Sequence, residues 1–496
     1  MESLWRKQIK IIEDKQGKES SGMPHSQDRH AGVLHAGFNH TRRDVIVIGA
    51  GMAGILTAYY LKERGKNVLV LEADKIASGQ TERTTAKITS QHGLKYSTLI
   101  NTMGIKKAEM YAKANEEAIR EYERLIKNHR ISCQFEIVPA YLYTLQNETT
   151  LKKEEQAAKR LGIDAFFARE TELPFPVAGA LCFQNQAQFS PLEFIRYLSS
   201  NLEIWEQTKV TAVRGNQVVT NGRVLTADKI VVATHYPFLN IPGFYFLRQH
   251  QERSYVLALS GCRKINGMYY GVDKEGLSLR QAGDTLLLGG GSHRTGENSN
   301  GGSYDLLMQA AKQYFPGSRV EARWSAQDCM PHDGVPFIGR YSAFTPDLYV
   351  ASGFQKWGMT SSMISALILR DELCGIENPY KKLFSPQRIN FRAAAGNFIL
   401  DAGMSVKGLS KGLLHGPKKD ADSLPCGHGG IVLVDGKRFA CCRDEAGELH
   451  MISARCSHMG CELEWNPDEK SWDCPCHGSR FDVDGNLLDN PSKKDR

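Results

Sequence analysis

The chain has 496 residues, 41% of them apolar and 24% charged, which allows two or three domains with separate cores. No apolar run is long enough to span a membrane, and none follows the basic N-terminus as in a secretory signal. We therefore expect a cytoplasmic protein without a transmembrane segment, and leave peripheral attachment to a membrane open. The net charge of +7 includes no basic run interleaved with aromatics, which argues against a nucleic-acid partner.

Charge and cysteine are unevenly distributed along the chain. Residues 424–496 hold nine Lys and Arg against thirteen Asp and Glu, and seven of the twelve cysteines lie between Cys426 and Cys476. Because cytosolic proteins seldom carry a disulfide framework, this clustering indicates a metal centre. An acidic segment on a basic body could steer charged partners. A solvated surface whose charge simply differs between domains explains the uneven distribution equally well.

The predicted elements begin after a polar leader, residues 1–42. Residues 4–12 have apolar side chains on one helical face, and a short helix packed on the body is favoured over one lying on a membrane. From residue 43 to 388, strands and helices intermingle as in an α/β domain. Strands are predicted at 45–48, 68–71, 229–233, 284–289 and 348–351, and helices at 51–64, 108–126 and 358–373.

Beyond residue 388 the composition of the sequence changes twice. Residues 389–424 are rich in Gly, Lys and Ser and are predicted to be a linker. Residues 425–496 contain short strand-like runs, at 430–434 and 439–442, next to Asp-Gly turn pairs. The last segment is therefore expected to be a small all-β domain.

A glycine-rich motif, GAGMAG at 49–54, follows the first predicted strand and opens the first helix. Gly49 permits a tight turn, Gly51 lets a pyrophosphate approach the backbone, and Gly54 lets the helix pack closely on the strand. The positive end of the helix then faces the phosphates. Glu72 ends the second strand, where its carboxylate can accept hydrogen bonds from a ribose diol. The motif predicts one dinucleotide site, and a second such motif is not found.

The residues from Asp44 to Arg388 resemble the FAD-dependent oxidoreductases of the glycine and D-amino acid oxidase (DAO) type. The resemblance rests on the glycine motif, on SGQTERTTAKITSQHG at 78–93, on IVVATHYP at 230–237, and on PHDGVPFIG at 331–339 with ASGFQKWGMT at 351–360. It implies FAD as cofactor and a Rossmann-like FAD-binding domain interleaved with an antiparallel-sheet substrate domain. It also implies a set of FAD contacts: Thr84, Thr85, Val210, Gly353, Trp357, Gly358 and Met359.

The same resemblance implies a substrate pocket between the flavin and the antiparallel sheet. An arginine there could hold a substrate carboxylate with two hydrogen bonds while the C–N bond lies over the flavin. Each candidate also has an ordinary reading, since a strand arginine is often solvated and a histidine is often a hydrogen-bonded filler. The candidates to touch substrate are His92, Tyr255, Arg280, His293, Arg294 and Trp357.

A second motif lies near the C-terminus, where CSH at 456–458 is followed by CPCH at 474–477. Two thiolates and two imidazoles on two short loops are a ligand set that zinc also accepts. A Cys-x-His pair followed by Cys-x-x-His is typical of a Rieske 2Fe–2S cluster, in which the thiolates bind one iron and the imidazoles the other. We therefore predict Cys456, His458, Cys474 and His477 as ligands of a Rieske cluster, with zinc as the alternative.

The C-terminal domain resembles the Rieske proteins of cytochrome bc and b6f complexes. In that family the cysteines matching Cys461 and Cys476 form a disulfide between the two cluster loops. The resemblance implies that the Ser479 hydroxyl donates to a cluster sulfur, whereas Phe481 stands where a tyrosine supplies a second donor. An FAD domain followed by a Rieske domain is similar to a bacterial fusion family of DAO-like dehydrogenases.

These observations predict an FAD-dependent dehydrogenase acting on an amine or amino acid. Electrons would pass from the flavin through the cluster to an external acceptor, a protein or a quinone. Two alternatives stay open: an oxygen-using amine oxidase with an auxiliary cluster, and a redox sensor or electron-transfer adaptor without a metabolite substrate. An oxygenase is disfavoured because no mononuclear iron site of two His and a carboxylate is apparent.

Overall fold

The computed structural model describes residues 2–10, 42–390, 394, 403 and 421–496. Most of the predicted leader and most of the predicted linker therefore lie outside the described residues. Residues 4–10 are helical and pack on the body, where Trp5 is buried and its Nε1 donates to the Thr84 carbonyl oxygen (2.7 Å). No helix in the described part of the chain is both long and apolar enough to cross a membrane.

A parallel sheet carries the glycine motif. Its elements are β1 (Arg43–Ile48), α2 (Met52–Glu63), β2 (Val68–Leu71), β7 (Glu203–Trp205), β8 (Val210–Arg214), β9 (Gln217–Thr220), β10 (Val224–Val232), β16 (Phe337–Arg340), β17 (Leu348–Ser352) and α8 (Gly358–Leu373). The strand order is β16-β17-β10-β1-β2-β7, and along it only β16 is antiparallel to its neighbour. Off this path, β9 pairs antiparallel with β10 and with β8. Val45 and Val47 pack toward α2 and α8, whereas Ile46 and Ile48 pack on the opposite face, as expected for a strand buried on both sides.

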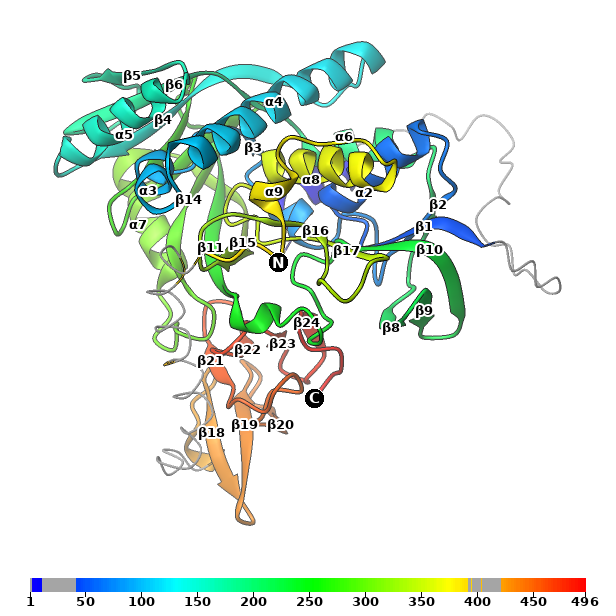
Figure 1. Ribbon diagram of the computed structural model, residues 1–496. Coiled ribbons are helices and arrows are strands. Elements are labelled where there is room, and N and C mark those ends of the chain that lie inside the picture. The colour runs from blue at the N-terminus through cyan, green and yellow to red at the C-terminus, as the bar shows by residue number, and fades with distance from the viewer. Residues whose placement is uncertain (1, 11–41, 391–393, 395–402, 404–420) are drawn as a thin grey trace, which may run out of the picture.

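A second, largely antiparallel sheet stands beside the first (Figure 1). Its strands are β3 (Lys87–Ile88), β4 (Glu136–Thr144), β5 (Ala165–Ala168), β6 (Gly179–Gln188), β11 (Gln249–Ser260), β12 (Met268–Gly271), β13 (Ser278–Ala282), β14 (Thr285–Arg294) and β15 (Arg319–Pro331). The order is β15-β11-β14-β13-β12-β4-β6-β3, and β5 pairs with β6. Only β12 and β4 run parallel. The chain passes repeatedly between the two sheets, so the two are interleaved in sequence.

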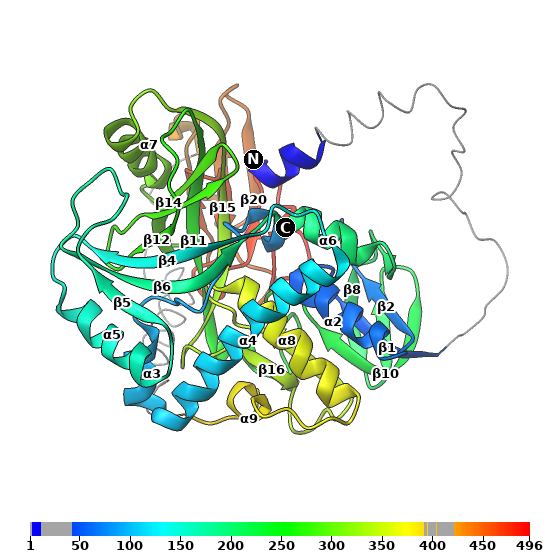
Figure 2. The ribbon, with the colours of Figure 1, turned by 90° about the horizontal axis from the view of Figure 1, so that it is seen from above.

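Helices and short turns of helix cover these sheets. They are η1 (Gln80–Arg83), α3 (Lys95–Met103), α4 (Ile105–His129), α5 (Thr149–Arg160), α6 (Pro191–Ser199), η2 (Tyr245–Leu247), α7 (Ser303–Tyr314) and α9 (Lys381–Phe384). Figure 2 shows α4 crossing in front of α2 and α8. The helix predicted over 108–126 lies within α4, and its apolar side chains are buried along its length, from Ala108 to Ile126.

The C-terminal segment forms two small antiparallel sheets at one end of the molecule (Figure 1). After η3 (Ala421–Ser423), the strands are β18 (Gly429–Val434), β19 (Lys437–Arg443), β20 (Leu449–Ser453), β21 (Glu464–Asn466), β22 (Ser471–Asp473), β23 (Arg480–Phe481) and β24 (Leu487–Asp489). Their order is β18-β19-β20 in one sheet and β21-β22-β23-β24 in the other. The predicted fold class is confirmed: a Rossmann-like sheet, an interleaved antiparallel sheet and a small all-β domain.

Candidate flavin and cluster sites

The glycine motif has the geometry that a pyrophosphate needs. Gly49 has φ of 106°, and a Cβ there would lie 2.5 Å from the Ala233 carbonyl oxygen. A Cβ on Gly54 would lie 1.9 Å from the Gly49 carbonyl oxygen, so helix α2 can sit this close to β1 only with glycine. Gly51 caps α2 and leaves the N-terminal amides of the helix facing the turn. These residues fit the FAD phosphates.

The residues predicted to bind the nucleotide end of FAD lie at the carboxyl end of β2. Glu72 accepts a hydrogen bond from the Ala50 amide (Oε2–N 2.7 Å), and burial raises its pKa. The amide of Thr208 donates to the Glu72 carbonyl oxygen (2.7 Å), which holds the chain leading into Val210 beside Glu72. Residues distant in sequence therefore meet where the resemblance expects adenine and ribose.

A cavity lies between the N-terminus of α8 and the antiparallel sheet. The predicted FAD contacts Thr84, Thr85, Trp357, Gly358 and Met359 all line it. Gly353 is not among the lining residues; it has φ of 76°, and a Cβ there would lie 2.5 Å from Pro331 Cγ. The remaining lining residues are Arg83, Lys87, Ser254, Tyr255, Val256, Tyr270, Gly276, Ser278, Gly289, Gly290, Ser292, Ala326, Asp328 and Lys356.

Two partly buried lysines, Lys87 and Lys356, are among the charged residues that line this cavity. Lys356 Nζ donates to Ser254 Oγ (2.9 Å) and pairs with Asp328 (3.3 Å) and Glu252 (3.4 Å), and these carboxylates raise its pKa despite burial. Lys87 Nζ donates to two neutral acceptors, the Tyr269 carbonyl oxygen (2.9 Å) and Ser278 Oγ (2.7 Å). Burial, with the charge of Arg280, lowers the pKa of Lys87 to about 7.

The structure does not bring His92 or Arg280 into the cavity. His92 lies behind its wall, stacked on Trp357 (ring centroids 4.7 Å apart), with Nδ1 accepting from the Tyr111 hydroxyl and Nε2 donating to the Thr89 carbonyl oxygen (2.7 Å each). Burial lowers the pKa of His92, so this histidine is a neutral core residue. The Arg280 guanidinium donates to the carbonyl oxygens of Thr85 and Ala86 (2.7 Å each) and is therefore not aimed at a substrate carboxylate.

Three other substrate candidates lie where the antiparallel sheet meets the C-terminal domain. His293 Nδ1 donates to the Arg294 carbonyl oxygen (2.8 Å), and its Nε2 accepts from the Tyr255 hydroxyl (3.0 Å). The Tyr255 hydroxyl also accepts from Asn466 of the C-terminal domain (3.3 Å), and Arg294 donates to the Pro475 carbonyl oxygen (3.4 Å). Of the six candidates, the cavity lining includes only Trp357 and Tyr255.

The predicted cluster ligands lie on two loops of similar shape. One loop closes with the Gly460 amide donating to the Cys456 carbonyl oxygen (3.0 Å), the other with Gly478 donating to Cys474 (2.9 Å), and both glycines have φ of 80°. The rings of His458 and His477 are 4.8 Å apart and nearly perpendicular. Two short stretches of sequence therefore bring two thiols and two imidazoles together.

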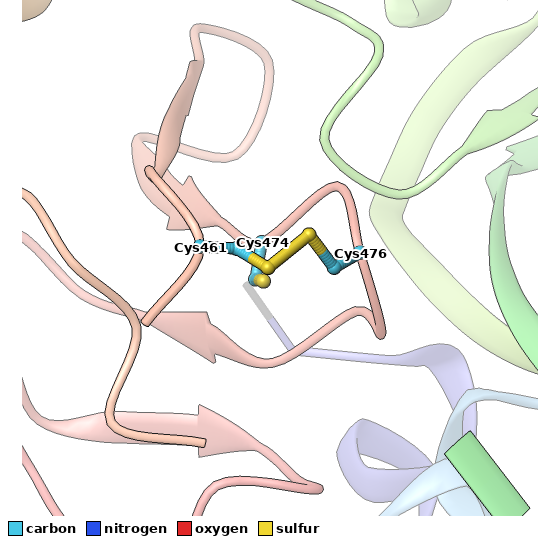
Figure 3. A group of neighbouring side chains, drawn as sticks. All are labelled: Cys461, Cys474 and Cys476. Carbon is cyan, nitrogen blue, oxygen red and sulfur yellow. A yellow bond between two sulfur atoms is a disulfide. The ribbon is translucent and has the colours of Figure 1, made fainter. Parts of the chain in front are cut away.

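The chemistry of these side chains fits an iron–sulfur cluster. The thiols of Cys456 and Cys474 are hydrogen-bonded, and this bond lowers the pKa of Cys456 to about 7. Burial lowers the pKa of His458 to about 4, so its ring is neutral, and its Nδ1 is buried with no hydrogen-bond partner among the described residues. A neutral imidazole with such a nitrogen suits an iron ligand. Cys461 and Cys476 form a disulfide beside Cys474 (Figure 3).

The first domain surrounds the two loops from several sides. Gln251 Nε2 donates to the His477 carbonyl oxygen (2.7 Å), and Gln327 Nε2 donates to that of Gly478 (2.8 Å). Asn240 Oδ1 accepts from His458 Nε2 (2.8 Å). The ring of Phe246 lies edge-on to both imidazoles, 5.7 Å from His477 and 6.2 Å from His458.

Comparison with known proteins identifies both domains. The family described as FAD dependent oxidoreductase (DAO) matches residues 44–372, and the Rieske [2Fe-2S] domain matches residues 418–495. The chain belongs to the DAO family of FAD-dependent oxidoreductases. The match defines the cofactors, FAD in the first domain and a Rieske 2Fe–2S cluster in the second, and makes the chain an enzyme.

Relatives of this DAO-family chain include one of the same architecture. The Rieske 2Fe-2S iron-sulfur protein YhfW of Bacillus subtilis is 36% identical over 474 residues, 92% of each chain. Gamma-glutamylputrescine oxidoreductase of Escherichia coli is 22% identical and covers 67% of this chain and 84% of its own length. Among solved structures, glycine oxidase of Geobacillus kaustophilus shares the fold (TM-score 0.59, 18% identity), covering 70% of this chain and 99% of its own.

Sequence reasoning missed several polar residues of the DAO-family cavity. Lys87 and Lys356 both stand inside motifs that identified the family, TTAKITS and GFQKWGMT. A lysine flanked by apolar and small polar residues in a predicted buried segment was a usable signal, because lysine is seldom buried unless it is paired. Asp328 had no comparable signal, since its place in the cavity depends on the pairing of β15 with β11.

Proposed function

We propose that this enzyme is a dehydrogenase that oxidises the C–N bond of a small amine or amino acid and passes the electrons through its Rieske cluster to an external acceptor. The observation that carries the proposal is the position of β11 between the two sites. Ser254 on this strand lines the flavin cavity, whereas Gln251 contacts the cluster loop at His477. FAD, when bound, takes a hydride and can release electrons singly, which matches a one-electron cluster.

Within this proposal the site residues have distinct roles. At its nucleotide end the FAD is held by Gly49, Gly51, Gly54, Glu72 and Val210. At its ring it is held by Thr84, Thr85, Gly353, Trp357, Gly358 and Met359. The cluster is held by Cys456, His458, Cys474 and His477. Of the catalytic residues predicted from the sequence, this proposal keeps Trp357. It replaces His92, Arg280 and His293 by the cavity residues Lys87 and Lys356.

Lys87 is proposed to bind the substrate's acidic group. Its hydrogen-bond partners are both neutral, so its charge is not already balanced by a carboxylate in contact. Lys356, in contrast, is paired with Asp328 and Glu252 and would orient polar groups without adding net positive charge. Trp357 and Tyr270, with rings 5.5 Å apart, shield the reacting carbon from water. The names of the relatives, an oxidoreductase of gamma-glutamylputrescine and an oxidase of glycine, support a C–N substrate.

Anaerobic reduction of the purified holoenzyme tests the proposal. A panel of amino acids and secondary amines should contain a compound that bleaches the flavin first and the cluster afterwards. In a Cys474→Ser variant the flavin should still bleach, while electron transfer to a one-electron acceptor slows. Unchanged turnover in that variant would favour an oxygen-using oxidase. A flavin that no compound reduces, but that a partner protein does, would favour an adaptor.

A further inference from the structure

We propose that an acidic one-electron carrier protein docks directly outside the cluster and receives the electron there. We call this docking site the exit surface; it consists of Ile241, Phe244, Leu247 and Met459. The inference rests on the proposed function only in one respect, that electrons leave the enzyme from the cluster.

A series of aromatic rings leads from the cluster ligands to the exit surface. The ring of Phe246 is 5.7 Å from His477 and 6.2 Å from His458, and the ring of Phe244 follows at 6.1 Å. The hydrogen bond from His458 Nε2 to Asn240 Oδ1 anchors the segment that carries both phenylalanines. A partner seated on Phe244 would therefore approach the cluster through packed aromatic side chains rather than through water.

The exit surface is more apolar than folding requires. Ile241 is 73% exposed, Leu247 49%, Met459 44% and Phe244 44%. Phe244 also has φ of 51°, a left-handed conformation that is rare for a bulky residue. The chain thus holds a half-exposed aromatic ring in a backbone conformation that costs free energy, and burial of the ring offsets only part of that cost. Such an outlier points to a function for the exposed ring.

Basic side chains border the exit surface. Arg455, Lys493, Lys494 and Arg496 are all exposed. Their positions follow from contacts near the cluster: Arg455 donates to the Gly460 carbonyl oxygen (3.0 Å), and Ser457 donates to that of Lys494 (2.8 Å). Lys493 lies over the ring of Phe238, 5.3 Å from its centre. Four of the nine basic residues in an otherwise acidic domain therefore gather around the cluster loop.

This pattern selects the kind of partner. An apolar centre with a charged border is the usual build of a protein interface, and contacts between redox proteins are small. A basic border steers an acidic protein toward the exit surface and favours one orientation. One short loop and a methionine offer little apolar area for inserting into a lipid surface. The occupant that fits is an acidic carrier protein.

The test starts from holoenzyme whose cluster has been reduced photochemically, so it needs neither the substrate nor a working flavin cavity. The reduced enzyme is mixed in a stopped-flow instrument with two cytochrome c proteins of similar potential, one with net negative and one with net positive charge. At low ionic strength the acidic cytochrome should be reduced at least about tenfold faster, and added salt should remove the difference. Similar rates for both probes would overturn the proposal.

Two variants with matched controls locate the surface. Replacing Lys493 and Lys494 together by Glu should slow reduction of the acidic probe about tenfold or more. The same change at Lys106 and Lys107, two exposed lysines on α4, should leave the rate unchanged. Phe244→Gly, which suits the left-handed backbone and does not threaten folding, should slow both probes several-fold. Its control is Phe166→Gly on β5, where the ring is 43% exposed.

The Rieske EPR signal of each variant, which should stay unchanged, shows that the cluster itself is intact. If the variants slow cytochrome reduction no more than their controls do, the assignment of the exit surface is wrong. So would sedimentation with anionic vesicles that depends on Lys493 and Lys494 while the cytochrome rates do not, because the surface would then bind a membrane. If the substrate panel fails but these rates behave as expected, the exit surface stands and the proposed dehydrogenase does not.

Discussion

The two redox sites of this enzyme are built in opposite ways. The cluster loops draw all four proposed ligands from 22 consecutive residues, and each loop is closed by its own glycine. The flavin cavity draws its lining from at least six separate stretches between Arg83 and Met359. A change at one cluster ligand therefore removes an essential part of a compact site, whereas a change in the cavity alters one of many contacts.

The largest effect is expected at the cluster ligands. His458→Ala should remove the Rieske EPR signal and most of the iron, because the imidazole ligand is lost and alanine offers no donor atom in its place. FAD should stay bound, since its glycine motif belongs to a different sheet. His450→Ala, in the same domain but paired with Asp484 at the surface, is the control. One zinc per chain in the wild-type protein, in place of about two irons, would refute the cluster itself.

The next effect concerns the contact between the two regions. Arg253 is fully buried and pairs with Glu469 (3.1 Å) and Asp489 (3.6 Å) of the Rieske domain. Arg253→Ala would remove one buried cation from these carboxylates, which keep Arg480 as a partner. The loss should therefore stay below the about 3–5 kcal/mol of a buried pair that loses its only partner. Lys264→Ala, which breaks a fully exposed pair with Asp284, should cost much less, because solvent screens such a pair. Denaturant unfolding of the holoenzyme compares the two, and equal losses would mean that the domains are not held by this network.

A smaller effect, visible only in a pH series, is expected in the cavity. The pKa of Lys87 is lowered by burial to about 7, so its charge is lost as the pH rises through 7. Substrates with a carboxylate should then bind more weakly, while amines without a carboxylate should not lose affinity. Lys87→Met should bind the carboxylate substrate weakly at every pH. Flavin bleaching titrations from pH 6 to 9 measure these affinities. If the affinity still changes with pH in Lys87→Met, a group other than Lys87 causes the change.

The same group predicts a change in stability. Between pH 7 and the unfolded pKa of 10.5 the unfolded chain binds more protons at Lys87 than the folded chain does. Stability should therefore rise with pH across this window, as the folded state no longer has to bury a charge. Lys87→Met should remove that rise, and thermal unfolding at several pH values would detect it.

The contrast between local and dispersed sites also explains what the sequence could predict. The cluster residues and the glycine motif could be placed one by one, because a few adjacent residues determine their geometry. The direction of the Arg280 side chain could not be predicted. It depends on the carbonyl oxygens of Thr85 and Ala86 and on the ring of Trp5, 5.3 Å away. All three residues come from distant parts of the chain. Side chains alternate along a strand, so His293 could face the cavity or the Rieske domain until the sheet was known.

The smallest expected effect is the tuning of the cluster by one hydroxyl. Ser479 Oγ accepts a hydrogen bond from the Ser492 amide (3.0 Å), which leaves its proton to donate to the Cys456 sulfur, and this bond helps to lower the pKa of that thiol. Reduction adds negative charge to the cluster, so a donor aimed at it favours the reduced form. Ser479→Ala should lower the potential by about 40 mV for each kcal/mol of hydrogen-bond energy that differs between the two redox states.

Phe481→Tyr tests the same argument from the other side. Phe481 is fully buried on β23, and a hydroxyl added to its ring would raise the potential only if it reaches a sulfur without displacing Trp472, which pairs with it on β22. An EPR-monitored redox titration of the full-length protein measures both variants. A potential unchanged in Ser479→Ala would mean that the hydroxyl does not act on the cluster. Tuning would then come from other groups around the cluster, such as the His458 amide, which donates to the Cys456 sulfur (3.4 Å), and Asn240, which accepts from His458.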